Sequence, residues 1–439
     1  MSAASQSSGR FAWGLATLVL VVLLALNLLP DRVAHGVIEP ALWKVHAAIT
    51  RLGQGTDSWK CMITAYDHIQ ASAAQPLYQT IFFDQEIKFQ YPPTALLVLA
   101  AFDAAGVAPG DRLGVFFAVS WLWFGLAFWA LARIAAVAAD RLAAPGYLAG
   151  SGERALLVSA ALIAGVVYYP LTQSFRNGQI QLWITAAALL AVAGWLRGQE
   201  GRAGMWLGLA SLAKPHIGLL LIWGLARRKW RFSAGLASVV AAGLLASIAR
   251  FGLTPHLGYL DVIRFLARHG ESYWSNQSLA GLLYRWPGVG KNMAWADSFP
   301  SYSPAIHGAS LAFAAGLLGL ALVLPARRPG AGGAIDLTIM MTSVTLAAPI
   351  AWRHHYGMML AAFPLLVVLA TRLERRRGPH LALIVVAFVA TGTFFRGTEV
   401  FAGTSLSALT SLTFFGGLLV LALLHAMQPL EATAPGPAP

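Results

Sequence analysis

Long apolar runs recur along this chain, and they restrict its possible folds more than any single motif does. The runs are about 17 to 25 residues long, the length that an α-helix needs to cross a hydrocarbon core of roughly 30 Å. Charged residues make up only 11% of the 439 residues, whereas a soluble chain carries roughly a quarter. We therefore predict an all-α polytopic membrane protein that lies in a lipid bilayer.

The first apolar run, residues 11–29, follows the basic residue Arg10. The run is longer than the apolar core of a signal peptide and has no clear small-residue cleavage site, so we predict a retained span. Cys61 is the single cysteine of the chain, which rules out a framework of intrachain disulfides.

The formal net charge of +13 raises the question of a nucleic-acid partner. The arginines, however, cluster in short segments between apolar runs, as the positive-inside rule describes for cytoplasmic loops. We therefore assign these loops to the cytoplasm and expect no nucleic-acid partner. The clusters are Arg133/Arg141/Arg154, Arg197/Arg202, Arg227/Arg228/Lys229/Arg231, Arg327/Arg328 and Arg372/Arg375/Arg376/Arg377.

This assignment predicts about 12 transmembrane helices with two extracytoplasmic loops. Residues 91–107 are apolar enough to form another span, but counting them would place the following arginine clusters outside. We interpret them as a helix along the outer membrane face. The alternative counts them as a span and fuses 203–226 into one helix, which gives the same total. The predicted spans are 11–30, 113–132, 154–171, 178–196, 203–213, 216–226, 232–251, 304–324, 335–351, 355–371, 380–396 and 404–425.

The same boundaries divide the chain into consecutive parts. The tail is rich in Pro and Ala and is predicted to be disordered. The parts are a cytoplasmic N-terminus (1–10), an N-terminal transmembrane module (11–251) that includes outer loop 31–112, a second outer loop (252–303), a C-terminal transmembrane module (304–427) and the tail (428–439).

The polar and aromatic motifs map mostly to outer helix ends or outer loops. Folding of a helical bundle does not require this, whereas a single extracytoplasmic site built from several helix ends does. The motifs are Asp57, Tyr91-Pro92-Pro93, Asn177-Gly178-Gln179, Lys214, Asn276-Gln277-Ser278 and Trp352-Arg353-His354-His355.

In order and spacing, these motifs resemble glycosyltransferase family 87, of the GT-C class of membrane glycosyltransferases. The resemblance covers about residues 11–400 and implies a GT-C-type bundle like that of polyprenol-phosphate-mannose-dependent mannosyltransferases and related arabinosyltransferases. The chain departs from the family at Lys60-Cys61-Met62, where small and aromatic residues are usual, and this leaves the acceptor open. Further matching segments are Leu77-Tyr78, Phe89-Gln90, Gly204-(3)-Gly208-Leu209-Ala210-(3)-Lys214-Pro215, Arg227-Arg228-Lys229-Trp230 and Tyr273-Trp274-Ser275.

Asp57 is the predicted catalytic base. Asp and Glu total only 18 residues, and most lie in polar loops or near helix ends. Asp57 instead opens a long polar and aromatic loop, where a carboxylate that faces a membrane-embedded cavity can take a proton from a substrate. The alternative is that Asp57 caps a short surface helix whose first turn holds Ser58 and Trp59.

Lys214 is predicted to bind the phosphate of a lipid donor, because a lysine between two apolar half-helices is costly unless it meets an anion or water. Snorkelling to the headgroups is the alternative. Arg353, His355 and Arg285 are predicted to join the phosphate site, since a guanidinium pairs with phosphate through two parallel bonds. Metal binding is disfavoured, because adjacent helical histidines point about 100° apart and no acid or cysteine is close in sequence.

The remaining motif residues are predicted to bind the sugar or the acceptor. Asn177 and Gln179 can donate to sugar hydroxyls, with capping of the next helix as an equal alternative. Trp352 can stack on a sugar face, with an interfacial aromatic belt as the alternative. The full set is Tyr91, Asn177, Gln179, Asn276, Gln277, Trp352 and His354.

Together these features predict an inverting glycosyltransferase of a bacterial plasma membrane with an extracytoplasmic active site. It is expected to move a sugar, by default mannose, from a polyprenyl-phosphate donor to a glycolipid or glycan acceptor, with residues 11–251 as the catalytic module. No cofactor is expected, because the chain has no Gly-rich phosphate loop and no Asp-x-Asp metal pair around Asp57.

Two other classes stay open. A transporter or flippase of lipid-linked sugars would more often show internal repeats and polar residues at mid-membrane in both halves. A polymerase or ligase of surface polysaccharide would more often depend on arginines and a histidine in one large late outer loop.

Overall fold

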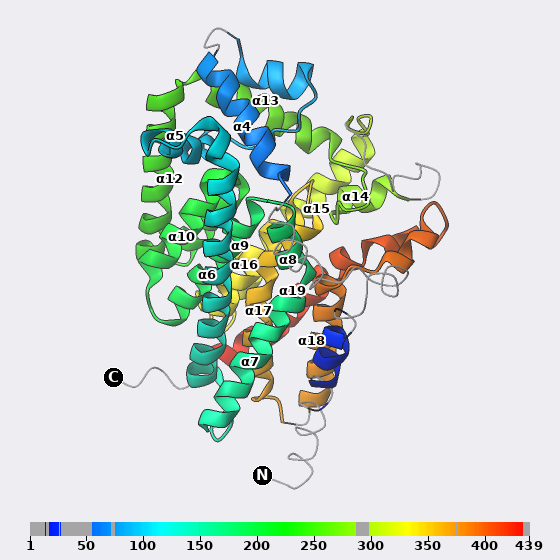
Figure 1. The fold of residues 1–439 in the computed structure, drawn as a ribbon. Helices are drawn as coiled ribbons and strands as arrows, with labels where there is room; N and C mark the ends of the chain where they lie inside the picture. Colours follow the sequence, from blue (N-terminus) through cyan, green and yellow to red (C-terminus); the bar gives the residue numbers. More distant parts are fainter. Residues whose placement is uncertain are drawn as a thin grey trace.

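The computed structural model describes residues 14, 17–25, 27, 55–71, 75–148, 150–286, 298–374 and 376–432 (Figure 1). Within this part of the chain every regular element is helical, and the one β-bridge joins Asn276 to Trp352. This confirms the all-α class. The predicted cytoplasmic N-terminus, much of the first span and the beginning of the first outer loop lie outside the described residues.

Helices account for most of the described residues, and short 3-10 or π turns often lead into them. The α-helices are α4 (Asp57–Ala71), α5 (Leu97–Ala104), α6 (Arg112–Leu142), α7 (Ser151–Val167), α8 (Tyr169–Arg176), α9 (Gln181–Leu196), α10 (Glu200–Ala213), α11 (Leu220–Ala226), α12 (Trp230–Phe251), α13 (Thr254–His269), α14 (Leu279–Tyr284), α15 (Pro304–Ala326), α16 (Ala334–Ala347), α17 (Ala362–Ala370), α18 (Arg377–Gly392) and α19 (Leu412–Ala432). The short turns are η1 (Gln79–Asp84), η2 (Pro93–Leu96), η3 (Pro109–Asp111), η4 (Pro215–Leu219), η5 (Arg353–Ala361), η6 (Arg396–Phe401) and η7 (Ser407–Ser411).

Several of these helices can cross a membrane. Among the described residues, four are long and apolar enough to do so alone: Pro109–Leu142, Trp230–Phe251, Pro304–Ala326 and Ser407–Ala432. The pair α7 and α8, bent by 52°, makes a fifth if it counts as one broken span. The chain is therefore a multi-pass membrane protein, and the total of twelve spans stays a prediction.

Long helices such as α6 and α12 run lengthwise through the molecule, whereas α4, α5 and α13 gather at one end, which we call the cavity end (Figure 1). We call the opposite end, where the arginine-rich loops lie, the basic end. At the cavity end, α9 begins beside α4, and α10 ends at Lys214, which contacts His355 in η5. At the basic end, Arg227 after α11 pairs with Asp336 in α16, and Arg372 after α17 donates to the last residue of α6. The predicted outer motifs in the described part of the chain therefore lie together at the cavity end.

Hydrogen bonds and an ion pair to neighbouring helices hold the arginine-rich loops at the basic end. Lys229 pairs with Glu200 at the start of α10, Arg328 donates to a carbonyl near the end of α19, and Arg377 donates to Ala370 O at the end of α17. The predicted separation of motifs from arginine clusters is therefore present in the structure. Which end faces the cytoplasm stays a prediction of the positive-inside rule.

Residues 91–107 do not run from one end to the other. The hydroxyl of Thr94 donates to Leu212 O at the end of α10, which lies at the cavity end. Asp103 accepts from Tyr66 of α4 and from Arg112 at the start of α6, also at the cavity end. The structure thus agrees with a helix along the membrane face and disagrees with a further span.

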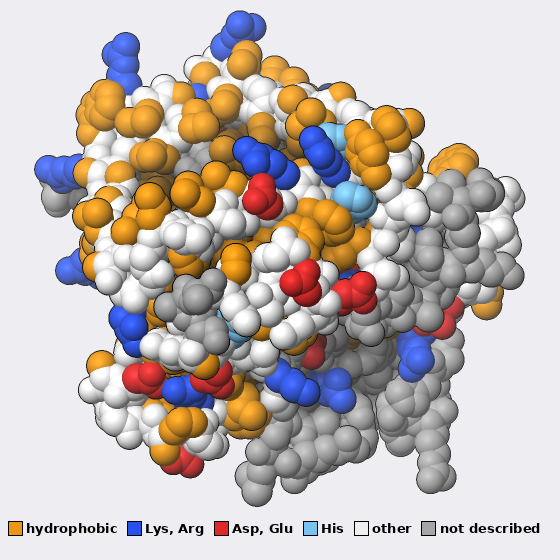
Figure 2. Space-filling model, turned by 90° about the horizontal axis from the view of Figure 1, so that it is seen from above, with side chains coloured by type: hydrophobic (Ala, Val, Ile, Leu, Met, Phe, Trp, Pro, Cys, Tyr) orange, Lys and Arg blue, Asp and Glu red, His pale blue; other side chains and the backbone are white. Residues whose placement is uncertain are grey.

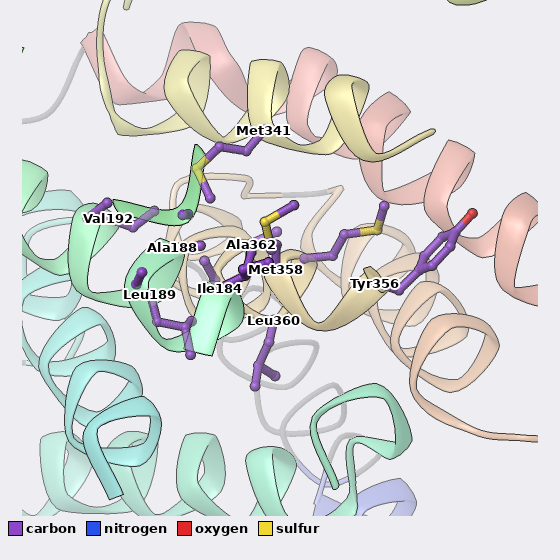
Figure 3. Packing of buried hydrophobic residues seen from close by; sticks show 14 of the residues in the cluster. Ile184, Ala188, Leu189, Val192, Met341, Tyr356, Met358, Leu360 and Ala362 are labelled. Atoms are coloured by element: carbon purple, nitrogen blue, oxygen red, sulfur yellow. The ribbon is translucent and has the colours of Figure 1, made fainter. Parts of the chain in front are cut away.

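The core is centred on α9, whose residues are all buried except Trp183. A helix that is apolar all round belongs in the interior of a bundle. Figure 3 shows Ile184 and Leu189 of α9 near Met341 of α16 and Met358 of η5, all within one buried cluster. This interior holds α9 and η5 in place, and it thereby positions Gln179 directly before α9 and His354 and His355 within η5.

The predicted disordered tail begins too early. Helix α19 continues to Ala432, because Gln428 Nε2 donates to Pro325 O at 3.1 Å and Glu431 accepts from the backbone N–H groups of Ala334 and Ile335 at 2.6 and 3.0 Å. Glu431 thereby satisfies donors at the start of α16 that have no partner within the helix. Residues 433–439 lie outside the described part of the chain.

Candidate functional site

A cavity of about 890 Å³ opens at the cavity end, within the usual size range of ligand sites. Figure 2 views this end from above, where hydrophobic side chains are interspersed with Lys, Arg, His and a few acidic groups. Asp57 is the one carboxylate among the described residues that line the cavity. Its apolar wall comes from η4, α13, α15 and α16, including Leu219, Ile263, Leu318 and Val344.

Three backbone hydrogen bonds between two segments that are distant in sequence fix the position of Asp57. Gly55 N donates to Arg176 O at 2.6 Å, Asp57 N to Asn177 O at 3.0 Å and Ser58 N to Gly178 O at 3.1 Å. The start of α4 is thus docked on the turn between α8 and α9. This explains why the Asp57 motif and the Asn177-Gly178-Gln179 motif occur together, although about 120 residues separate them.

Gly178 allows this close approach. Its φ of +65° is a conformation that favours glycine. A Cβ at position 178 would also lie 1.8 Å from Gly55 O, and a Cβ at Gly55 would lie 2.7 Å from Asn177 O. Any larger residue at either position would separate the two segments and displace Asp57.

A chain of side-chain hydrogen bonds leads to the Asp57 carboxylate. Tyr91 OH lies 2.8 Å from Ser58 Oγ, which donates to Gln179 Oε1 at 2.9 Å and accepts from Ile180 N at 3.0 Å. Since the Ser58 proton is used on Gln179, the Tyr91 hydroxyl donates to Ser58. Gln179 Nε2 then donates to Asp57 Oδ2 at 3.1 Å, so Tyr91 and Gln179 orient the carboxylate.

The helix-cap alternative for Asp57 is not what the structure shows. Asp57 is the first residue of α4, and among the described residues no backbone N–H of α4 donates to its carboxylate. Although part of the side chain opens to the cavity, the surrounding protein keeps water from it, and this raises the pKa of Asp57 above its ordinary value. The hydrogen bonds from Gln179 and Asn177 oppose this shift only in part.

Lys214 lies on the cavity because the helix breaks there. Pro215 cannot continue α10 and forces the residue before it into an extended conformation, and Lys214 has φ −134° and ψ 93°. Its Nζ contacts His355 Nε2. The ammonium group can only donate, so the ring nitrogen accepts. No carboxylate of the described residues lies within ion-pair distance of Lys214, so the site lacks a counter-charge.

The structure brings most of the predicted residues to this cavity and adds others. His354 and Trp352 line it, together with Tyr91, Asn177 and Gln179. His216 and Lys88 also line the cavity, although the sequence analysis assigns no role to either. His216 directly follows Lys214-Pro215, and Lys88 directly precedes the Phe89-Gln90-Tyr91 motif. The further lining residues that sequence reasoning missed are Cys61, Gln90, Gln173, Tyr259, Tyr273 and Ser275.

Two predicted phosphate ligands do not line the cavity. The Arg353 guanidinium is buried over the rings of Trp274 and Phe394, with its Cζ atom 4.1 and 3.6 Å from their centroids. The Arg285 guanidinium donates to Thr410, Ser411 and Tyr273 O. Their predicted role in phosphate binding is therefore not supported, because both side chains are engaged in packing.

Asn276 and Gln277 are also structural. Asn276 donates to Glu271 O and accepts from Ala351 N, which holds the loop before α14 against the segment before η5. Gln277 Nε2 donates to Trp274 O and Thr410 O. Both side chains are fully buried and do not line the cavity, so the predicted sugar contacts are not supported for them.

No group of three or more His, Cys, Asp or Glu side chains in the described part of the chain is arranged to hold a metal ion. Metal independence stays a prediction, since it concerns the reaction.

The fold and the cavity define a multi-pass membrane protein with one carboxylate facing a set of basic and carboxamide side chains. The model of glycosyltransferase family 87 matches residues 89–349, more than half of the chain. The protein therefore belongs to glycosyltransferase family 87 and is a membrane glycosyltransferase, as the resemblance predicted. The match contains Lys214 and the Asn177 motif, whereas Asp57 and His355 lie on either side of it. No curated protein and no solved structure matches the chain.

Proposed function

We propose that this glycosyltransferase moves a sugar from a polyprenyl-phosphate donor to a hydroxyl of a glycolipid or glycan acceptor, with inversion at the anomeric carbon. One observation carries the proposal: a single cavity joins a carboxylate, a lysine–histidine pair and an apolar wall. A lipid-linked sugar phosphate has the three complementary parts, which are a reacting sugar, an anion and a hydrocarbon chain.

In the proposed mechanism, the phosphodiester of the donor lies at Lys214 and His355, and its first isoprene units lie along Leu219, Ile263 and Leu318. The Lys214 ammonium group would supply the positive charge that stabilises the buried phosphodiester of the donor. The same charge stabilises the leaving group, because polyprenyl phosphate departs with the electron pair of the broken bond to the anomeric carbon.

Asp57 acts as the general base. It takes the proton of the acceptor hydroxyl while the hydroxyl oxygen forms the new bond to the anomeric carbon, so Asp57 ends the step protonated. A raised pKa makes this carboxylate a stronger base. Gln179 and Tyr91 hold it in place through the hydrogen-bond chain that ends at Asp57 Oδ2, which limits the geometry of proton transfer.

The remaining features of the proposal come from the family resemblance and from the charge pattern. Mannose is the default sugar, the bundle has twelve spans, and the reaction needs no metal ion or other cofactor. The enzyme lies in a bacterial plasma membrane with the cavity end on the periplasmic or extracytoplasmic side, because the arginine-rich loops are at the opposite end.

The test supplies the purified protein in detergent with polyprenyl-phosphate mannose and polyprenyl-phosphate arabinose separately, plus a membrane glycolipid extract as the acceptor source. Release of polyprenyl phosphate that depends on the extract supports the proposal. Absence of release from both donors contradicts it. Movement of intact donor across a proteoliposome membrane, without cleavage, would support the transporter alternative instead.

A further inference from the structure

Gln173 has no role in the mechanism above, yet it lines the cavity beside the residues that do. It lies in α8, a helix of eight residues that a break at Tyr168 turns by 52° from α7. Gln173 and Asn177 are one helical turn apart, as the bond from Asn177 N to Gln173 O at 2.9 Å shows. Residues at this spacing share one helix face, so α8 presents two carboxamides to the cavity.

The Gln173 side chain contains an acceptor without a donor. Its Oε1 atom is buried, and no described residue donates to it. By contrast, the Gln179 carboxamide is used at both atoms, since Oε1 accepts from Ser58 and Nε2 donates to Asp57. An unsatisfied buried acceptor destabilises the folded state, so Gln173 favours a ligand that brings a hydroxyl donor.

The position of α8 indicates which hydroxyl this is. On one side, α8 leads into Asn177 and Gln179, which surround Asp57. On the other, α8 packs against η5, which carries His354 and His355 at the proposed phosphate site. The donor sugar has to lie between the base and the phosphate, because the bond that breaks joins its anomeric carbon to the phosphate oxygen.

We infer that Gln173 is a specificity-determining residue whose Oε1 accepts a hydrogen bond from a hydroxyl of the donor sugar. The inference rests on the proposed function, and it adds a sugar contact that separates a sugar-bearing lipid from bare polyprenyl phosphate. A carboxamide is neutral, and Asp57 is the one carboxylate on the cavity among the described residues. Gln173 therefore accepts from a sugar hydroxyl without adding a charge to the cavity.

The test compares binding of two lipids, polyprenyl-phosphate mannose and bare polyprenyl phosphate, to the purified protein. Gln173→Met keeps the length of the side chain and removes the acceptor. We expect affinity for the sugar-bearing lipid to fall about 2- to 10-fold, the range for one neutral hydrogen bond, with affinity for the bare lipid unchanged. The unchanged value would also show that the variant is folded.

Gln181→Met is the matched control. Gln181 is the first residue of α9, is 1% exposed, and has no described partner for either side-chain atom, but it does not line the cavity. It should leave the ratio of the two affinities at the wild-type value. Equal losses for both lipids in Gln173→Met, or no loss, would overturn the inference. A wild-type protein that binds neither lipid would overturn the proposed function itself.

Discussion

The two ends of this molecule use charge in opposite ways. At the basic end, Arg227 and Asp336 form an ion pair at 2.6 Å with side chains only 5% and 0% exposed, and Glu431 satisfies the start of α16. At the cavity end, Lys214 has no described carboxylate partner, and Gln173 Oε1 has no described donor. The Arg227–Asp336 pair and the Glu431 bonds are completed within the fold, whereas Lys214 and Gln173 Oε1 line a cavity where a ligand can complete them.

This difference separates residues that hold the bundle together from residues that bind. An unpaired buried charge or acceptor lowers the stability of the folded state. An unpaired group that lines a cavity therefore indicates a role in ligand binding. Not every polar group at the cavity end is unpaired, because Arg285 is bonded to Thr410 and Ser411. Paired groups should therefore affect stability when changed, and unpaired groups that line the cavity should affect turnover or affinity.

The largest expected effect is on turnover, from Asp57→Asn. The amide keeps the size of the carboxylate but cannot take the proton, and general-base catalysis contributes roughly 10² to 10⁴ in rate. Turnover should fall by about that factor, while donor affinity and the unfolding temperature stay near wild type. Asp84→Asn is the control, since Asp84 bonds only to the nearby Gln79 among the described residues.

Asp67 lies in the same loop but is a less suitable control, because it pairs with the buried Arg112 at 2.7 Å. Asp67→Asn should lower stability and spare the turnover of the folded fraction. If Asp57→Asn keeps wild-type turnover, the general base is another residue. If that variant unfolds, Asp57 has a structural role instead.

At the basic end, Asp336→Asn should lower stability without a selective loss of activity. It leaves Arg227 buried opposite a neutral side chain, and breaking a buried pair costs about 3 to 5 kcal/mol. Thermal unfolding in detergent measures this. Glu200→Gln breaks a half-buried pair with Lys229 and should cost much less. A wild-type unfolding temperature for Asp336→Asn would remove the contrast between the ends, and Glu200→Gln shows how much of the loss depends on burial of the pair.

Lys214→Ala should weaken donor binding about 10- to 150-fold, the range for hydrogen bonds to a charged group, and leave the fold intact. His355→Ala should act in the same direction, whereas Arg353→Ala should lower stability because its guanidinium packs on two rings. Affinity for polyprenyl phosphate is the measurement. Lys229→Ala, at the basic end, serves as control, and wild-type affinity in Lys214→Ala would exclude the phosphate site.

The pH dependence should be smaller, about tenfold per pH unit on the acidic side. Turnover needs ionised Asp57, so it falls as pH drops through the pKa of that group, which lies above its ordinary value. Since the raised pKa also means that the folded state binds a proton more readily, the ionised carboxylate lowers stability as pH rises. Asp57→Asn should therefore lose the acidic limb and unfold no earlier than wild type at neutral pH.

Much of the fold follows from local sequence signals. Apolar run length predicted most of the helices, although α6 continues to Leu142 beyond the predicted end at 132 and α19 begins at Leu412 rather than at 404. Pro215 predicted the break that exposes Lys214. The arginine clusters predicted that the motifs share one end. The docking of Gly55 on Arg176 could not be predicted, because backbone bonds between distant segments leave no side-chain pattern.

The site was harder to predict where one residue type serves two purposes. An arginine after an apolar run looks the same in sequence whether it meets a ligand or, like Arg353, stacks on rings from two other segments. Gln173 belongs to no motif, and its place on the cavity depends on the bend at Tyr168 between α7 and α8. The continuation of α19 depends on Ala334, nearly 100 residues away.

Chemical modification of Cys61 can show whether the donor binds in the cavity between Asp57 and Lys214. Cys61 is the single cysteine of the chain, lines the cavity and lies one turn after Asp57, where its thiol donates to Ser58 O at 3.1 Å. Burial raises the pKa of Cys61 to about 12, so modification by a small methanethiosulfonate reagent should be slow and easy to time. Cys61→Ser gives the background.

The rate of Cys61 modification is measured with and without saturating polyprenyl-phosphate mannose, in the wild type and in Lys214→Ala. We expect the donor to slow modification in the wild type and to protect much less at the same concentration in Lys214→Ala. An unchanged rate in the wild type, at a donor concentration that supports turnover, would place the donor elsewhere and contradict the account.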